Sequence, residues 1–227
     1  METVQEKILR LSRHLSKIGF FAATGGNLAL RVDADHMAVT PSAIDYHKMT
    51  REQVCIVRIN DLVQTSGDAT PTVEASLHAR VLRLRPDVQC SLHTHQPLAS
   101  ACTLLGKPLT VTDSRLSKEL GRSIPLVGYA PSGTGWLAKK LQDAVAPDVN
   151  AYLMRNHGVL CCGPDVETTV TRLQDLEAFC RKHLVAQIDA RTRQEPGFRA
   201  AASRVIAALS NPSFLSRTSL KFRDTQS

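Results

Sequence analysis

The sequence of 227 residues has no run that approaches the roughly 18 consecutive apolar residues of a membrane-spanning helix. Its N-terminal segment, METVQEKILRLSRHL, mixes charged with apolar residues and lacks the continuous apolar core of a secretory signal peptide. The chain also has no internal repeat, low-complexity tract or linker. We therefore expect a cytoplasmic protein with no membrane partner, built as a single domain.

Aromatic residues are scarce, at 4% of the chain, which argues against a surface that stacks on nucleic-acid bases. None of the six cysteines forms a Cys-x-x-Cys pair. With 43% hydrophobic residues, a chain of this length can bury a core without disulfides. We interpret most of the cysteines as small buried apolar residues and assign none of them a function.

Positive charge is concentrated towards the C-terminus. Residues 181–227 hold nine lysines and arginines against three acidic residues, in a chain whose net charge is +7. This segment contains no recognised nucleic-acid-binding motif. We therefore predict no nucleic-acid partner, and we expect residues 210–227 to form a basic, mobile tail after a domain of residues 1–209.

Apolar periodicity predicts helices and strands that alternate along the chain. Helices are expected at residues 4–18, 73–84, from 97 onwards, 135–145, 166–190 and 200–209. Strands are expected at residues 27–32, 36–40, 53–59, 88–94, 125–129, 151–156 and 159–162, with a polar loop at 65–71. This alternation predicts an α/β fold.

The segment Ser91-Leu-His-Thr-His-Gln-Pro97 is the most informative about chemistry. His93 and His95 are two residues apart, and alternate residues of a strand point to the same face. His157 lies at another expected strand end, and Glu74 opens the helix before the His-x-His strand. Three imidazoles and a carboxylate suit Zn²⁺, with Mn²⁺, Fe²⁺ or Co²⁺ also possible.

Spacing alone leaves open whether these histidines bind a metal or are buried structural residues. The remaining histidines are interpreted as ordinary, with His78 on the outer or packing face of its helix; they are His14, His36, His47, His78 and His183.

Five short motifs occur in one order along the chain: Gly26-Asn27, Thr40-Pro-Ser42, Pro71-Thr-Val-Glu74, His93-Thr-His95 and Asn156-His-Gly158. In this order and spacing the sequence resembles the class II aldolase/adducin family from about residue 5 to 190. That family includes L-fuculose-phosphate aldolase and L-ribulose-5-phosphate 4-epimerase. The resemblance implies one three-layer α/β/α domain around a mixed, largely antiparallel sheet. It also implies a homotetramer with active sites between subunits.

By the same resemblance, His93, His95 and His157 are the metal ligands, and Glu74 is both a metal ligand and the catalytic acid/base. The adducin branch keeps the fold but lacks the metal ligands. Because all four residues are present, the resemblance favours an enzyme.

Sugar-phosphate members of the family hold their phosphate with a Gly-Asn turn, a Thr-Gly pair and a Ser-Ser pair. The positions that match are the expected substrate-binding residues, namely Gly26, Asn27, Ser42 and Thr72. However, Ala43 replaces the glycine, and Thr72-Val73 replaces the serine pair. These replacements leave fewer hydrogen-bond donors in the expected anion pocket, so a carboxylate substrate is an open alternative. Thr72 and backbone amides could nevertheless be enough to bind a phosphate.

By the same resemblance, Ser114 stands where the aldolases have a tyrosine that reaches the site of a neighbouring subunit. Asp113 is the candidate replacement acid/base, and Arg115 is a candidate for binding a substrate carboxylate. Both could instead be exposed loop charges. No tyrosine follows Tyr152, although the family has one near its C-terminus.

Together, these observations predict a divalent-metal-dependent lyase that acts on a small hydroxylated carbonyl compound, a sugar or sugar phosphate, through a metal-bound enediolate. Aldol cleavage ranks first, and decarboxylation of a hydroxylated keto or aromatic acid ranks second. A catalytically silent, adducin-like assembly module is the alternative from another class, and a nucleic-acid binder ranks third.

Overall fold

The hairpin and strand patterns assemble into one eight-stranded sheet in the computed structural model, which describes residues 2–21 and 25–209. The strand order is β4-β3-β2-β1-β5-β10-β9-β8, and every pairing is antiparallel except that of β8 with β9. The strands are β1 (Asn27–Arg31), β2 (His36–Val39), β3 (Cys55–Arg58), β4 (Gln64–Ser66), β5 (Cys90–Thr94), β8 (Leu126–Val127), β9 (Ala151–Met154) and β10 (Val159–Gly163). Two further strands, β6 (Leu109–Thr110) and β7 (Ser123–Ile124), form a separate pair.

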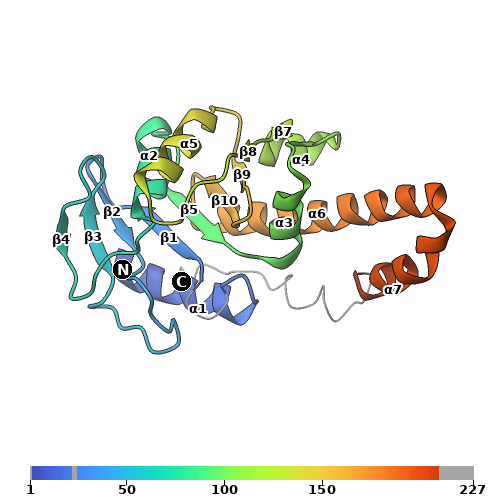
Figure 1. Ribbon diagram of the computed structural model, residues 1–227. Coiled ribbons are helices and arrows are strands. Elements are labelled where there is room, and N and C mark those ends of the chain that lie inside the picture. Colours follow the sequence, from blue (N-terminus) through green and yellow to red (C-terminus); the bar gives the residue numbers. More distant parts are fainter. Residues whose placement is uncertain (1, 22–24, 210–227) are drawn as a thin grey trace.

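Helices cover both faces of this sheet (Figure 1). The helices are α1 (Val4–Lys17), α2 (Ala75–Leu84), α3 (Pro97–Cys102), α4 (Ser114–Leu120), α5 (Gly135–Ala144), α6 (Val166–Gln194) and α7 (Arg199–Leu209). One apolar core lies between the sheet and α2 with α5, and the other between the sheet and α1, α3, α4 and α6. The three-layer α/β/α fold with a mixed, largely antiparallel sheet is therefore confirmed.

The central strands β9 and β10 are almost continuous apolar runs because both of their faces are covered. In β9, Ala151 and Leu153 enter one core, whereas Tyr152 and Met154 enter the other. Side chains of successive strand residues point to opposite faces, so a strand between two helix layers needs apolar residues at every position.

The predicted helices and strands are confirmed apart from their ends, and α6 continues to Gln194. One prediction was wrong: β4 occupies part of the segment expected to be a polar loop. Its residues are polar because β4 is an edge strand that is mostly exposed to water. Helix α4 and the β6–β7 pair were not predicted from the sequence. The predicted tail, residues 210–227, lies outside the described residues.

All six cysteines are free and buried, as expected from the sequence. In the part of the chain that the structure describes, no helix combines the length and apolar character needed to cross a membrane.

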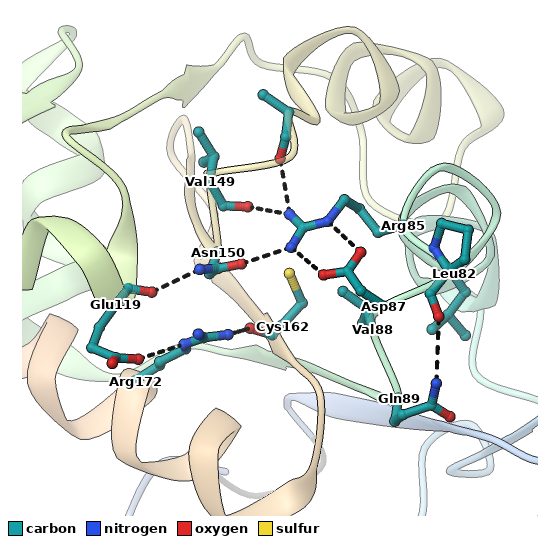
Figure 2. Close-up of polar contacts among 12 residues, drawn as sticks. Leu82, Arg85, Asp87, Val88, Gln89, Glu119, Val149, Asn150, Cys162 and Arg172 are labelled. Carbon is teal, nitrogen blue, oxygen red and sulfur yellow. Dashed lines mark hydrogen bonds and ion pairs between the residues drawn. The ribbon is translucent and has the colours of Figure 1, made fainter.

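A buried arginine anchors the C-terminal end of α2, as Figure 2 shows. The Arg85 guanidinium donates to the Asp87 carboxylate at 2.7 and 2.8 Å and to the backbone carbonyls of Ala146 and Val149 at 2.8 and 2.9 Å. It also donates to Asn150, whose side-chain amide donates to the Glu119 carbonyl. These bonds tie the C-terminal end of α2 to the chain before β9 and to α4. They thereby fix the position of α2, whose N-terminal end follows directly after Glu74.

Candidate metal centre

The two histidines of the His-x-His motif lie at the end of a central strand. His93 is in β5, opposite Asn27 of β1 on one side and Leu160 of β10 on the other, and its side chain is completely buried. His95 follows the strand, and its Nε2 lies 3.0 Å from Nε2 of His93. The prediction that alternation along the strand brings these two rings together is confirmed.

His157 reaches the same point from the turn between β9 and β10. The turn closes through a hydrogen bond from the His157 amide to the Met154 carbonyl, 3.1 Å long. Asn156 takes a left-handed conformation (φ 55°), which asparagine tolerates better than most residues. Ligand nitrogens of His93, His95 and His157 all lie within 4.8 Å of one another, so these histidines can hold a metal ion.

Gly158 allows this turn to approach the β5 end. A Cβ atom at this position would lie 2.5 Å from the Thr94 carbonyl oxygen and 2.5 Å from Cδ2 of His95. Because the Thr94 oxygen belongs to the backbone of a paired strand, it cannot move aside cheaply. The glycine is therefore a requirement of the packing of His95.

We expect Gly158→Ala to lower both stability and metal affinity. The clash should cost about 1–3 kcal/mol of unfolding free energy, as overpacking typically does, and displacement of His95 should weaken Zn²⁺ binding at least about tenfold. Chemical denaturation of the metal-free protein and Zn²⁺ competition with a chelator measure the two effects. Gly197→Ala is the matched control, because a Cβ there meets nothing within 4 Å. Unchanged metal affinity in Gly158→Ala would contradict the assignment of His95 as a metal ligand.

Glu74 stands immediately before α2 and points its carboxylate at the histidines. Its Oε2 lies 3.2 Å from Nε2 of His93, and its Oε1 lies 3.3 Å from Nε2 of His157. Each oxygen also accepts a hydrogen bond, Oε2 from the Asn27 amide at 2.8 Å and Oε1 from the Ser132 hydroxyl at 2.7 Å. The carboxylate is thus held in one orientation between two imidazoles.

The charges of the cluster suit a cation. Burial opposes ionisation of Glu74, but a positive charge on His93, which is present only at low pH, and the hydrogen bonds from Ser132 and Asn27 outweigh it and lower the pKa of Glu74. Burial lowers the pKa of His93 to about 3 and also lowers the pKa of His95. At neutral pH these groups are therefore an anionic carboxylate and uncharged imidazoles, the protonation states that metal binding requires.

The tautomer of His93 also fits a metal ligand. Its Nδ1 lies 2.9 Å from the Val159 carbonyl oxygen, which can only accept a hydrogen bond. Nδ1 therefore carries the proton and Nε2, the atom that faces the cluster, has a free lone pair. The donor set of three imidazole nitrogens and one carboxylate oxygen fits a divalent metal ion.

The other expected substrate-binding residues lie on segments that lead to this cluster. Gly26 forms the turn before β1 with φ 88°, and its carbonyl accepts a hydrogen bond from the buried Tyr46 hydroxyl. Thr72 is buried, and its hydroxyl accepts a hydrogen bond from the Glu74 amide. Ser42 bonds through its amide to the Thr70 carbonyl. The structure brings Asn27 into contact with Glu74, whereas Gly26, Ser42 and Thr72 act here through backbone or local bonds.

Ala43 has φ 52°, in the left-handed region where glycine carries no penalty. The backbone conformation expected of a glycine at this position is thus kept although the residue is alanine.

The structure places Asp113 and Arg115 in local contacts. The Asp113 carboxylate caps α4 by accepting from the Leu116 amide at 2.8 Å, and Ser114 is the first residue of that helix. Arg115 is exposed and forms a bidentate pair with Asp175 of α6, at 2.7 and 3.0 Å. Both residues are exposed, as the alternative interpretation expected, but they are not loop charges, because Asp113 is the N-cap of α4 and Arg115 lies within that helix.

Two residues of the site were missed in the sequence. Ser132 lies in the loop before α5, 58 positions from the Glu74 that it contacts, and no local pattern indicates it. His78 was interpreted as ordinary, yet it is completely buried and bonded to Asn27 and Ser91. A signal existed for His78, since residues four apart share a helix face and His78 is four positions after Glu74.

This fold is that of the class II aldolases, and the comparison with known families agrees. Residues 6–184 match the family described as Class II Aldolase and Adducin N-terminal domain, and the chain belongs to it. Members that are aldolases depend on a metal ion.

Individual relatives agree with this family. The chain is 25% identical to L-fuculose phosphate aldolase of Haemophilus influenzae, over 80% of this chain and 82% of that protein. It is 26% identical to 5-deoxy-D-ribulose 1-phosphate aldolase of Bacillus thuringiensis, over 79% and 83% of the two chains. A solved L-fuculose 1-phosphate aldolase has the same fold, with a TM-score of 0.74 and 23% identity over 81% of this chain and 86% of that one.

Proposed function

We propose that the protein is a metal-dependent lyase of the aldolase type that cleaves a C–C bond of a small hydroxylated carbonyl compound. One observation carries the proposal: nitrogens of His93, His95 and His157 and the Glu74 carboxylate converge on one point. A catalytically silent assembly module has no need of this donor set.

His93, His95 and His157 would hold the ion, with Glu74 as a further ligand in the resting state. A bound divalent ion would act as a Lewis acid that polarises a substrate carbonyl and stabilises negative charge on neighbouring oxygens. Zn²⁺ is the first candidate, and Mn²⁺, Fe²⁺ and Co²⁺ suit the same ligand types.

Glu74 is the proposed acid/base. In aldol cleavage a hydroxyl loses its proton, the neighbouring C–C bond breaks to release an aldehyde, and the remaining enediolate takes up a proton to become the second product. Because the Glu74 carboxylate is ionised at neutral pH, it would first take up a proton from water and then give that proton to carbon, while Asn27 and Ser132 hold it in orientation beside the cluster. His95 and His157 keep part of their surface exposed, which leaves the cluster accessible to a small molecule.

Asp113 is the proposed acceptor of the hydroxyl proton, and Arg115 is the proposed partner of a substrate anion, both from a neighbouring copy of the chain. This arrangement requires the homotetramer with sites between subunits that the family resemblance implies. The cap bond from the Leu116 amide uses Oδ1 of Asp113, which leaves Oδ2 to accept a proton from substrate. The exposed Arg115 could release Asp175 and bind a substrate anion instead.

The names of the relatives support a sugar phosphate as substrate and carbohydrate metabolism as the setting. One observation favours the second candidate, a decarboxylase of a hydroxylated keto or aromatic acid. Val73 is 62% exposed directly before Glu74 and offers an apolar surface where a hydroxyl would serve a phosphate. Thr72 and the left-handed turn at Ala43 support the phosphate instead, through backbone groups.

A thermal-shift panel on Zn²⁺- and Mn²⁺-loaded protein tests the substrate class. The panel contains ketose phosphates, free ketoses and hydroxylated keto or aromatic acids, and metal-free protein is the control. A ligand at about 100 times its dissociation constant adds about 2.7 kcal/mol of stability. For a chain of this size we expect a rise of roughly 2–4 °C per kcal/mol. Shifts by ketose phosphates support the aldolase. Shifts by carboxylates alone support the decarboxylase, which release of CO₂ would then check.

A further inference from the structure

A chain of three buried hydrogen bonds runs from β5 through α2 and β1 to the candidate acid/base. The Ser91 hydroxyl lies 2.8 Å from Nδ1 of His78, and Nε2 of His78 lies 2.8 Å from Oδ1 of Asn27. Nδ2 of Asn27 in turn lies 2.8 Å from Oε2 of Glu74. Ser91 and His78 are completely buried, and Asn27 is 6% exposed. No sequence motif joins these residues, which come from three elements of the fold.

The Glu74 carboxylate at the end of this chain of hydrogen bonds determines which atom donates and which accepts in each bond. An ionised carboxylate can only accept, so Asn27 must turn its NH₂ group towards Glu74 and its carbonyl towards His78. The His78 nitrogen that faces this carbonyl must then carry a proton, which places the proton on Nε2. A neutral imidazole has one N–H, so Nδ1 is bare and accepts from the Ser91 hydroxyl. Burial keeps His78 neutral, since it lowers its pKa to about 4.

The reverse tautomer would undo this arrangement. With the proton on Nδ1, Nε2 of His78 would have a lone pair that attracts the NH₂ group of Asn27. The amide would flip and turn its carbonyl oxygen to the Glu74 carboxylate, where two acceptors repel each other. The tautomer of His78 thus decides whether Asn27 holds or repels Glu74.

We propose that His78 is a positioning residue, which fixes the Asn27 amide so that it donates to Glu74 and holds this carboxylate towards the three histidines. His78 acts through Asn27 and touches neither the metal ligands nor the substrate. The inference rests on the proposed function of Glu74 as a metal ligand and acid/base. It adds a residue, one helical turn after Glu74 on α2, that orients Glu74 through Asn27.

Two substitutions of His78 separate positioning from packing. His78→Leu fills the space but removes the donor to Asn27, whereas His78→Gln can present an N–H group near the place of Nε2. We expect Zn²⁺ affinity to fall about 10- to 100-fold in His78→Leu, the range typical of groups that orient metal ligands, and to be largely recovered in His78→Gln. Competition with a chromophoric chelator measures the affinity, and thermal unfolding of the metal-free variants reports on the fold. Equal losses in both variants, or no loss in His78→Leu, would overturn the proposal.

The wild-type protein provides a test that does not depend on any variant folding. Long-range proton–nitrogen NMR of the metal-free, ¹⁵N-histidine-labelled protein at neutral pH reports which nitrogen of His78 carries the proton. We expect a protonated Nε2 and a bare Nδ1. A proton on Nδ1, or on both nitrogens, would overturn the proposal.

The two measurements also distinguish the failure of this inference from the failure of the proposed function. If the wild-type protein binds no metal after reconstitution, the proposed function fails. The NMR tautomer of His78 in the metal-free protein then still tests whether His78 orients the Asn27 amide. If the wild type binds Zn²⁺ and His78→Leu binds it equally well, the proposed function survives and the positioning role does not.

Discussion

Replacing His93 by alanine is expected to abolish stoichiometric metal binding and to reduce turnover to background. His93 is the central ligand candidate: its Nε2 lies 3.0 Å from Nε2 of His95 and 3.2 Å from Oε2 of Glu74. Its loss should therefore exceed the roughly 10- to 100-fold cost in affinity that is typical of residues outside the coordination shell. Elemental analysis of reconstituted protein and turnover of the substrate from the thermal-shift panel measure the two effects.

The matched control is His47→Ala, which removes an exposed histidine that contacts Ser16 of α1. We expect it to keep full metal content and turnover. Because His93 is buried, His93→Gln serves as a second variant that leaves a smaller cavity, and its metal-free form should unfold cooperatively. Stoichiometric metal in a folded His93→Ala or His93→Gln protein would mean that the cluster is not the metal site.

The second large effect is expected from Glu74→Gln. The amide keeps the shape of the side chain but cannot take up a proton at neutral pH, so the catalytic acid/base is lost. General acid–base catalysis typically contributes about 10²- to 10⁴-fold, and we expect kcat to fall by this factor in metal-loaded protein. Metal should still bind through the three histidines, although more weakly. Steady-state kinetics, with metal content measured on the same sample, separates the two effects.

Glu119→Gln makes the same chemical change at a carboxylate paired with Arg172, in the network drawn in Figure 2. It should leave kcat unchanged. A fully metal-loaded Glu74→Gln enzyme with wild-type kcat would contradict the assignment of Glu74 as acid/base and would point to another residue, with Asp113 the next to be replaced.

Local sequence patterns predicted much of the fold and part of the site. Strand alternation was sufficient to place His93 and His95 on one face, since that property depends only on residues two apart at the end of one strand, where β5 closes at Thr94. The apolar runs at β9 and β10 indicated strands because burial on both faces demands apolar residues at every position. The edge strand β4 was missed for the opposite reason, because a strand exposed to water needs no apolar pattern.

The rest of the site depends on contacts between distant segments. Spacing alone did not show that His157 meets His93, since the two are 64 positions apart, and only the family resemblance placed them at one metal site before the structure was described. Ser132 and His78 have no such resemblance to indicate them. Their contacts with Glu74 and Asn27 arise because the α5 loop and α2 lie on the same face of the sheet.

By itself, the sequence determined the α/β class, the order of most helices and strands, the family and the residues with metal-binding chemistry, because these follow from periodicity, residue type and short motifs. Only the tertiary structure decided which oxygen of Glu74 faces which histidine, which nitrogen of His93 is free, and which groups hold the carboxylate in place. Those properties depend on distances of about 3 Å between strands, helices and turns that are far apart in the chain, and hydrogen-bond direction is defined only at such distances.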